Sequence, residues 1–246
     1  MKKKIVFFTG NRAEYYLLIP VILSFLNSNK FTIFLIRAFD IKRFTSDNSI
    51  KTLEKKIYSI IDLKIEYSRN SHIKNTHYFG NIIKNASNIL HKIKPNLLFV
   101  YGDRFETFAT VNSAFQMSIP IAHIEGGDIT TGGLKDDFVR HAITKLSHLH
   151  FVTNEKSFQK IINLGEEKWR IKNIGFTGNY FKKFKASKKE ITDYFDLNNS
   201  KKIIIFTLHP DDKNRKRQDK KILVCIKVLK YFSQNNYKII ITSPNN

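Results

Sequence analysis

Two apolar stretches, each ending at an acidic residue, constrain the fold of this chain more than any other feature. Residues 97–101 lead into Gly102 and Asp103, and residues 119–124 lead into Glu125. Between these stretches, residues 104–117 place apolar side chains at the spacing of an α-helix. The whole segment therefore predicts a β-α-β unit.

The acidic residues of this unit are expected at one edge of a parallel sheet. A β-α-β crossover makes its two strands parallel, and ligands of open α/β sheets bind beyond the carboxyl ends of the strands. Asp103 and Glu125 each follow a strand, beside glycines that let a ligand approach the backbone. Asp103 has an alternative role as the cap of the following helix. Glu125 is followed by two glycines and has no obvious helix to cap.

The N-terminal part of the chain shows the same strand-then-helix order. Residues 4–9 predict a strand, and Gly10-Asn11-Arg12 predicts a turn before a helix. Such a turn offers backbone N–H groups to an anion, and a guanidinium suits phosphate, although a surface ion pair is the alternative for Arg12. The turn lacks the pattern of a dinucleotide fingerprint or a P-loop. Further elements are predicted as strands at 31–38 and 65–67 and helices at 53–63 and 73–93.

Residues 128–134, rich in Gly and Thr, predict a loop at the ligand edge, and a helix is expected at 138–147. Asp136 and Asp137 begin that helix, where acidic side chains suit the positive end of its dipole. Asp137 and His141 are four residues apart and share a helix face beside Arg140, a spacing that an ordinary surface pair also has.

Three further elements complete the first predicted domain. They are a strand at 149–153, a helix at 155–164 capped by Asn154, and a strand at 171–178. His148 and His150 alternate along the first of these, but no third ligand has a convincing spacing, so no metal site is expected.

A polar, lysine-rich segment at 179–200 predicts a linker between two domains, 1–178 and 201–246. The second domain begins with a strand at 203–207, a helix at 223–232 and a strand at 237–242. An α/β domain of ordinary size needs on the order of 100 residues. The expected class is therefore α/β, with a complete N-terminal Rossmann-like domain and the start of a second, incomplete one.

Composition narrows the classes of protein that fit. The chain has one cysteine, so no disulfide framework is possible. This residue, Cys225, lies in an apolar run and is expected to be a buried thiol. The N-terminal apolar run is shorter than the roughly 7–15 residues of a signal-peptide core, and no run approaches the roughly 20 residues of a membrane span. We therefore expect a cytoplasmic protein without a membrane partner.

The net charge of +21 favours anionic partners. Its densest basic run, residues 213–221, is more simply a solvated loop or helix start than a groove for a phosphate backbone, and no nucleic-acid-reading motif is visible. We expect no nucleic-acid partner. A basic nucleic-acid binder is the last alternative, and its binding would weaken steeply with salt.

Five segments together resemble the hydrolysing UDP-N-acetylglucosamine 2-epimerases of sialic acid, legionaminic acid and related nonulosonic acid biosynthesis. They are TGNRAEYYLL at 9–18, GDRFE at 102–106, HIEGGD at 123–128, DDFVRHAITKLSHLHF at 136–151 and LHP at 208–210. The resemblance implies a GT-B-like fold with the active site in the cleft between two Rossmann-like domains. It covers only the front part of the family pattern, which implies a C-terminally truncated chain. Tyr16 and Ile19 depart from the pattern, because relatives usually have Gly and often Lys there.

The resemblance also implies a reaction and its residues. The family eliminates UDP from UDP-N-acetylglucosamine, or from a 4-acetamido-6-deoxy relative, and hydrates the glycal to a free N-acetylmannosamine-type sugar, without a cofactor. Three carboxylates in one cleft push their proton affinities apart, as opposite proton-transfer roles require. The implied catalytic residues are Asp103, Glu125, Asp137 and His209, and the implied substrate-binding residues are Arg12, Arg140 and His141. Which carboxylate is the base is left open.

Two alternatives remain beside this reaction. The chain is either a catalytically incompetent fragment or one half of a split enzyme whose partner chain supplies the missing part. A glycosyltransferase of the GT-B architecture would instead transfer the sugar to an acceptor. A full-length member is expected to be a homo-oligomer.

Overall fold

The structure, a computed structural model, describes residues 2–38, 48–63, 71–130, 134–183, 186–197, 202–208 and 215–242. The chain divides into two compact units, Met1–Tyr180 and Phe181–Asn246. The domain limits expected from the sequence, 1–178 and 201–246 around a linker, stay predictions.

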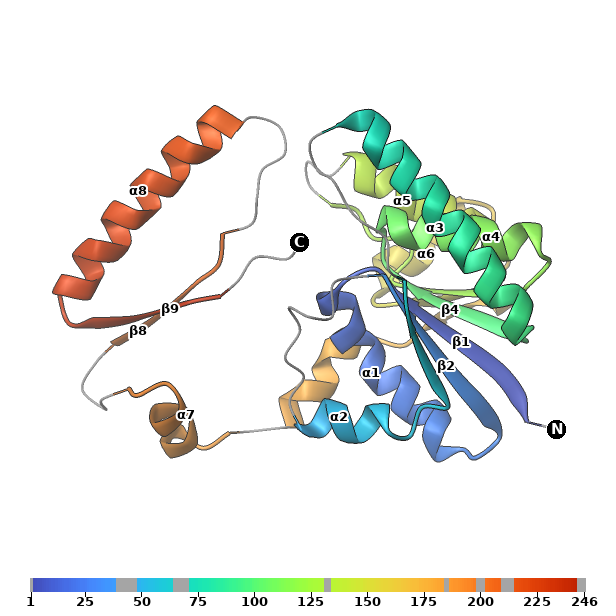
Figure 1. Ribbon diagram of the computed structural model, residues 1–246, viewed down its shortest axis with the longest axis horizontal. Coiled ribbons are helices and arrows are strands. Elements are labelled where there is room, and N and C mark those ends of the chain that lie inside the picture. Colours follow the sequence, from blue (N-terminus) through green and yellow to red (C-terminus); the bar gives the residue numbers. More distant parts are fainter. Residues whose placement is uncertain are drawn as a thin grey trace. The chain divides into compact units, whose positions relative to one another are not determined.

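The first unit is built on a parallel sheet, part of which is labelled in Figure 1. The sheet has seven strands in the order β3-β2-β1-β4-β5-β6-β7. The strands are β1 Lys3–Thr9, β2 Phe31–Arg37, β3 Ser59–Asp62, β4 Leu97–Tyr101, β5 Ile121–Ile124, β6 Leu149–Val152 and β7 Ile171–Asn173. The chain runs outward from β1 to β3, then returns to β4 and continues to the opposite edge. Such a reversal opens a crevice beyond the carboxyl ends of β1 and β4.

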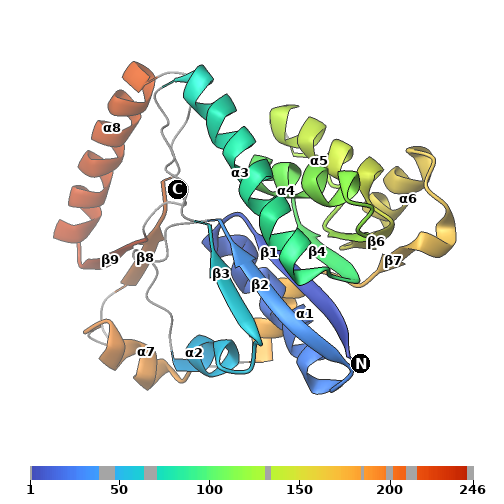
Figure 2. The same ribbon diagram turned by 45° about the vertical axis from the view of Figure 1, so that its right-hand side comes forward.

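Helices cover both faces of this sheet. They are α1 Arg12–Asn27, α2 Asn48–Glu54, α3 His72–Ile93, α4 Phe105–Gln116, α5 Leu134–Leu146 and α6 Glu155–Asn163, with short 3-10 turns η2 Lys168–Arg170 and η3 Thr177–Lys183. The helices α1 and α2 lie on one face, and α3, α4 and α5 lie on the other (Figure 2). Strands buried on both faces carry continuous apolar runs, as β1 does.

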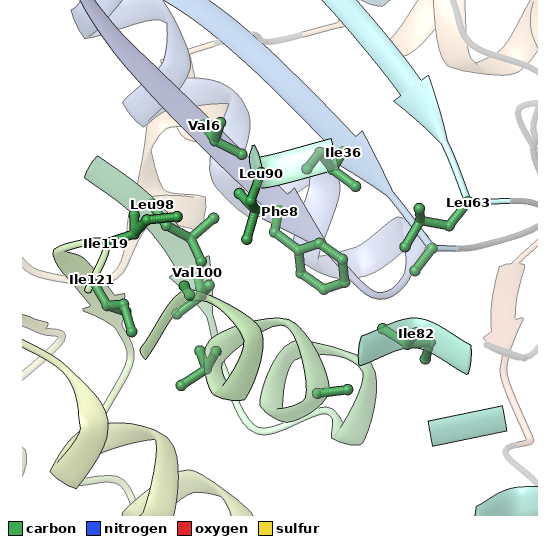
Figure 3. Packing of buried hydrophobic residues seen from close by; sticks show 14 of the residues in the cluster. Val6, Phe8, Ile36, Leu63, Ile82, Leu90, Leu98, Val100, Ile119 and Ile121 are labelled. Atoms are coloured by element: carbon green, nitrogen blue, oxygen red, sulfur yellow. The ribbon is translucent and has the colours of Figure 1, made fainter. Parts of the chain in front are cut away.

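Successive side chains of β1 pack into opposite layers of the core. Val6 and Phe8 face α3 and α4 in the main cluster of buried side chains, together with Leu98 and Val100 of β4 (Figure 3). Phe7 points to the α1 side, where its ring stacks on that of Phe99 with centroids 5.0 Å apart. Alternation along a strand therefore joins the two helical layers through the sheet.

The second unit contains α7 Lys188–Tyr194, β8 Lys202–Phe206, α8 Arg215–Gln234 and β9 Tyr237–Ile241. The strands β8 and β9 form a parallel pair. Cys225, expected to be buried, is only partly buried on α8. The reason is that two strands and one helix leave neighbouring apolar side chains of α8 exposed, including Leu223 and Val224.

One predicted element is wrong because of strand pairing, and another is shorter than predicted. The helix expected at 53–63 is instead α2 at Asn48–Glu54 followed by the strand β3, because Ser59–Asp62 pairs with the end of β2. The strand expected at 171–178 ends at Asn173, before Gly175 with its positive φ of 73°. The strand expected at 65–67 lies outside the described residues.

Most other elements of the first unit are confirmed within a few residues. The helix predicted at 73–93 is α3, the β-α-β unit is β4, α4 and β5, and Asn154 caps α6 by accepting a hydrogen bond from the backbone N of Ser157. Among the described residues, no helix combines the length and apolarity needed to cross a membrane.

Replacing Leu98 with alanine tests the main core. Leu98 is fully buried, so Leu98→Ala is expected to lower the free energy of unfolding by about 2–5 kcal/mol through lost burial and a residual cavity. Ile73→Ala, on an exposed position of α3, serves as control and should change it by less than about 0.5 kcal/mol. Urea unfolding followed by circular dichroism measures both. Equal effects of the two substitutions would contradict this packing.

Candidate active site

The turns after β4 and β5 bring the two acidic stretches of the sequence side by side. Tyr101 pairs with Ile124 at the ends of the strands, and the backbone N of Gly102 donates to the Ile124 carbonyl at 3.0 Å. Asp103 and Glu125 therefore leave the sheet from neighbouring positions. This confirms the expected placement of both carboxylates at the carboxyl edge.

Arg140 of α5 connects the segments that carry these acids. Its guanidinium forms an ion pair with Asp103 and another, at 3.1 Å, with Asp137. It also donates to the Asp128 carbonyl at 2.7 Å and to the Thr130 hydroxyl at 3.2 Å. Arg140 is buried, so these contacts replace its hydration. We call Asp103, Glu125, Asp137 and Arg140 the acid cluster.

The sequence left open whether Asp103 caps the following helix, and it placed Asp137 at the start of another. The contacts of these two residues show what each side chain binds. The N-cap of α4 is Arg104, without a side-chain capping bond, so Asp103 does not cap this helix. Asp137 lies in the first turn of α5 and accepts from the backbone N of Thr130 at 2.9 Å as well as from Arg140. These bonds tie the start of α5 to the loop that follows β5.

Glu125 occupies a strained and partly buried position. Its φ of 65° is in the left-handed region, which costs energy for a residue with a side chain. Burial and the negative charge of Asp128 raise the pKa of Glu125 to about 7, and a hydrogen bond from Tyr101 opposes this rise. A carboxyl group whose pKa lies near neutral pH can take up or release a proton during a reaction.

Asp103 differs from Glu125 in its partners. Burial raises the pKa of Asp103, while the positive charge of Arg140 opposes the rise. Asp103 thus has a permanent cationic partner, and Glu125 has a neutral hydroxyl. The two neighbouring carboxyl groups are therefore held in different electrostatic environments.

Glu14 is a buried acid of this region that the sequence analysis missed. Its carboxyl group accepts from the backbone N of Gly10 at 2.9 Å, and a Cβ placed on Gly102 would lie 3.3 Å from its Oε1. Burial raises the pKa of Glu14 to about 8, while the bond from Gly10 and the charge of Arg104 lower it. The spacing of Asn11, the N-cap of α1, and Glu14 at the third helical position is that of a capping box, which was the available signal.

The remaining predicted site residues have different outcomes. Arg12 is the first residue of α1, at the carboxyl end of β1, so it lies at the same edge of the sheet as the acid cluster. His141 follows Arg140 on α5, and its pKa is lowered mainly by burial. His209 lies outside the described residues. The roles of all three stay predictions.

His148 and His150 have structural partners. His148 Nδ1 accepts from the backbone N of Ile121 at 3.2 Å, and His150 lies 3.3 Å from the buried carboxylate of Glu166. Glu166 also pairs with Lys145 and Arg170. Over the described part of the chain, no group of three or more His, Cys, Asp or Glu side chains is placed to hold a metal ion.

An open cavity of about 680 Å³ lies on the α1 side of the sheet, and no residue of the acid cluster lines it. Its walls include Phe25, Phe99, Phe151 and Phe176, and they are mainly apolar. Such a surface offers no acid or base for proton transfer. The acid cluster is the better candidate for the active site.

Comparison with known proteins assigns the family. A family described as UDP-N-acetylglucosamine 2-epimerase matches residues 44–246 of this chain. The chain belongs to this epimerase family. The match includes every member of the acid cluster and most of the chain.

Two relatives of this chain are both described as N,N'-diacetylbacillosamine 2-epimerases (hydrolyzing). The GDP/UDP-N,N'-diacetylbacillosamine 2-epimerase (hydrolyzing) of Campylobacter jejuni is 28% identical over 99% of this chain and 63% of its own length. The UDP-N,N'-diacetylbacillosamine 2-epimerase (hydrolyzing) of Legionella pneumophila is 29% identical over 85% of this chain and 56% of its own length. The chain thus spans about 60% of the length of these relatives.

Solved structures of the epimerase family share the fold. The UDP-GlcNAc 2-epimerase from Neisseria meningitidis, in a crystal structure with bound UDP-GlcNAc, superposes with a TM-score of 0.75 at 23% identity. This superposition covers 99% of the present chain and 66% of the other. It confirms the expected α/β, GT-B-like class.

Replacing Glu14 with glutamine is expected to remove a pH-dependent loss of stability. The pKa of Glu14 is about 8 in the fold, against a reference value of 4.5, so its stabilising contribution is complete below pH 4.5 and is lost as the pH rises toward 8. Within that window the wild type loses roughly 1.4 kcal/mol per pH unit through this group. Glu14→Gln should therefore gain stability relative to the wild type as the pH rises, measured by urea unfolding at several pH values.

Glu190→Gln is the control for this experiment. Glu190 is an exposed carboxylate whose pKa is lowered by hydrogen bonds from Ser187, so it stays ionised in the folded and unfolded states above its reference value of 4.5. Its substitution should leave the pH dependence between about pH 5 and 8 as in the wild type. A constant difference between Glu14→Gln and wild type over this range would show that Glu14 is ionised in the fold.

Proposed function

We propose that this chain carries the acid and base groups of a hydrolysing 2-epimerase. Its substrate is UDP-N-acetylglucosamine or a 4-acetamido-6-deoxy relative, and its products are UDP and the free N-acetylmannosamine-type sugar. The observation that carries the proposal is the acid cluster, in which an ion-paired Asp103 lies beside a Glu125 with a pKa of about 7. Family membership and the hydrolysing relatives support the reaction class.

The proposed chemistry needs two opposite proton transfers. A base removes the weakly acidic proton from C2, and the electron pair forms the C1–C2 double bond as the bond from C1 to the UDP oxygen breaks. Water then adds its oxygen to C1, and a proton returns to C2 on the other face of the ring. A carboxylate within hydrogen-bond distance of C2–H can serve as the base, and cationic groups stabilise the departing diphosphate.

We assign the base role to Glu125. Its carboxyl group has a pKa near neutral pH and accepts a hydrogen bond from a neutral hydroxyl group, so it can accept a proton without breaking an ion pair. Asp103 and Asp137 are held by Arg140, which suits them to orient the sugar and to supply the second proton transfer. Arg12, His141 and His209 are assigned to the diphosphate and sugar, as the resemblance implies.

Substitution of Glu125 tests the proposed reaction. The purified chain is incubated with UDP-N-acetylglucosamine, and UDP and free N-acetylmannosamine are followed by NMR. Wild-type chain is expected to form both, and Glu125→Gln should lower turnover by at least about 100-fold, the lower range for loss of a general base. Glu167→Gln, at an exposed position before β7, is the control and should retain activity.

Three outcomes would contradict the proposal. Sugar transferred to an acceptor would indicate a glycosyltransferase. Near-normal turnover of Glu125→Gln would remove Glu125 from the mechanism. Absence of turnover in a folded wild-type sample would show that this chain does not catalyse the reaction by itself.

Substitution of Tyr101 tests the pKa assignment of the base. Glu125 must be ionised to accept the C2 proton, so the rate should fall as the pH drops through about 7. The hydrogen bond from Tyr101 lowers the pKa of Glu125, so Tyr101→Phe should move this acidic limb to higher pH. The pH profile of kcat/KM measures the shift. An unchanged acidic limb would mean that another group controls it.

A further inference from the structure

His123 lies at the centre of the three segments that carry the acid cluster. It is the third residue of β5, and its side chain is fully buried. Its Nε2 lies 2.8 Å from the Gly102 carbonyl oxygen, and its Nδ1 lies 3.1 Å from the Thr144 hydroxyl of α5. The ring thus connects the turn before Asp103 with the helix of Arg140.

The partners of His123 determine its protonation. The Gly102 carbonyl can only accept a hydrogen bond, so Nε2 carries the proton that is donated to it. Burial lowers the pKa of His123 to about 3, and His150 on β6 and Arg140 and His141 on α5 also disfavour the imidazolium. The ring is therefore neutral, and its unprotonated Nδ1 accepts from the Thr144 hydroxyl.

The glycine turns are packed closely around this ring. A Cβ on Gly126, the residue after Glu125, would lie 2.9 Å from the Thr144 hydroxyl oxygen and 3.0 Å from His123 Nδ1. The Thr144 hydroxyl also donates to the Arg140 carbonyl oxygen at 2.9 Å, so its one proton is shared between this oxygen and His123 Nδ1. One imidazole therefore contacts the turn of Asp103, the turn of Glu125 and the helix of Arg140.

We propose that His123, as a neutral Nε2–H tautomer, is a positioning residue that fixes the Gly102 turn and thereby holds Asp103 against Arg140. His123 acts through Gly102 and does not touch the substrate. Its effect on turnover rests on the proposed function, whereas its tautomer and its effect on Asp103 do not. If His123 only filled space in the core, a side chain of similar volume without an N–H donor could replace it.

Two substitutions separate the effect of the Nε2–H donor of His123 from the effect of the volume of its ring. His123→Leu fills space without a donor, and His123→Gln places an amide N–H where Nε2–H lies, so it can still donate to Gly102. We expect His123→Leu to shift the 13Cγ titration of Asp103 to higher pH, because the Arg140 contact is loosened, and His123→Gln to restore it. With UDP-N-acetylglucosamine, kcat should fall more than tenfold in His123→Leu, with KM changed less than threefold, and recover in His123→Gln.

The tautomer is measured directly by long-range 1H–15N NMR of histidine-labelled wild-type chain. His123, assigned by the loss of its signals in His123→Gln, should show the Nε2–H pattern without titration between about pH 5.5 and 8. Thr144→Val should shift the Nδ1 signal and leave Nε2–H in place. These spectra test the tautomer of His123 even if His123→Leu fails to fold, because they do not use that variant.

The outcomes distinguish this inference from the proposed function. The expected spectra and Asp103 titrations in a chain without turnover would support the positioning role and contradict the proposed function. An Nδ1–H tautomer, a ring that titrates in this range, or equal Asp103 titrations in His123→Leu and His123→Gln would overturn the positioning role, even in an active enzyme.

Discussion

The buried guanidinium of Arg140 is the interaction on which the candidate site depends. It binds carboxylates from two segments distant in sequence, Asp103 and Asp137, and the backbone of a third at Asp128. The planar, permanently charged fork of arginine suits such multiple contacts. Without it, the acidic groups at the edge of the sheet would repel one another in a partly desolvated place. The cluster therefore forms only when β4, β5 and α5 are folded together.

Around this guanidinium, neutral polar groups support the turns. Tyr101 donates to Glu125, His123 bonds the Gly102 carbonyl, and the buried Glu14 accepts from Gly10. Neutral groups can make these hydrogen bonds in a region shielded from water without the free-energy cost of burying a further charge. The result is one ion-paired acid next to an acid whose pKa is near neutral. That difference is what a reaction with two opposite proton transfers requires.

The close approach of the turns explains the glycines in the motifs. Gly102 has a φ of 69°, and Gly127 has a φ of 81° and would place a Cβ 2.4 Å from the Ser157 carbonyl oxygen. Gly126 has no room for a side chain beside His123. In the first turn, a Cβ on Gly10 would meet that of Glu106 at 3.3 Å. The spacing of these motifs therefore reflects packing as well as contact with a ligand.

Local patterns predicted much of the first unit. The apolar runs and the helical spacing between them indicated β4, α4 and β5, and parallel connectivity then placed Asp103 and Glu125 at one edge. Local patterns failed for β3, because the strand state of Ser59–Asp62 comes from pairing with β2. They also failed for the pairing of Asp103, because a partner 37 residues away is not encoded in a short stretch of sequence. For Glu14 they offered only the capping-box spacing, which does not reveal that the side chain is buried.

The amino-acid sequence by itself determined the α/β class, the parallel unit with two acidic strand ends, and the family motifs. Only the tertiary structure decided that Asp103 binds Arg140 and does not cap α4, that Glu125 has a pKa of about 7, and that His123 is neutral. The physical reason is that periodicity and connectivity are properties of neighbouring residues along the chain. Protonation and ion pairing depend on desolvation and on charges that folding brings together from distant segments.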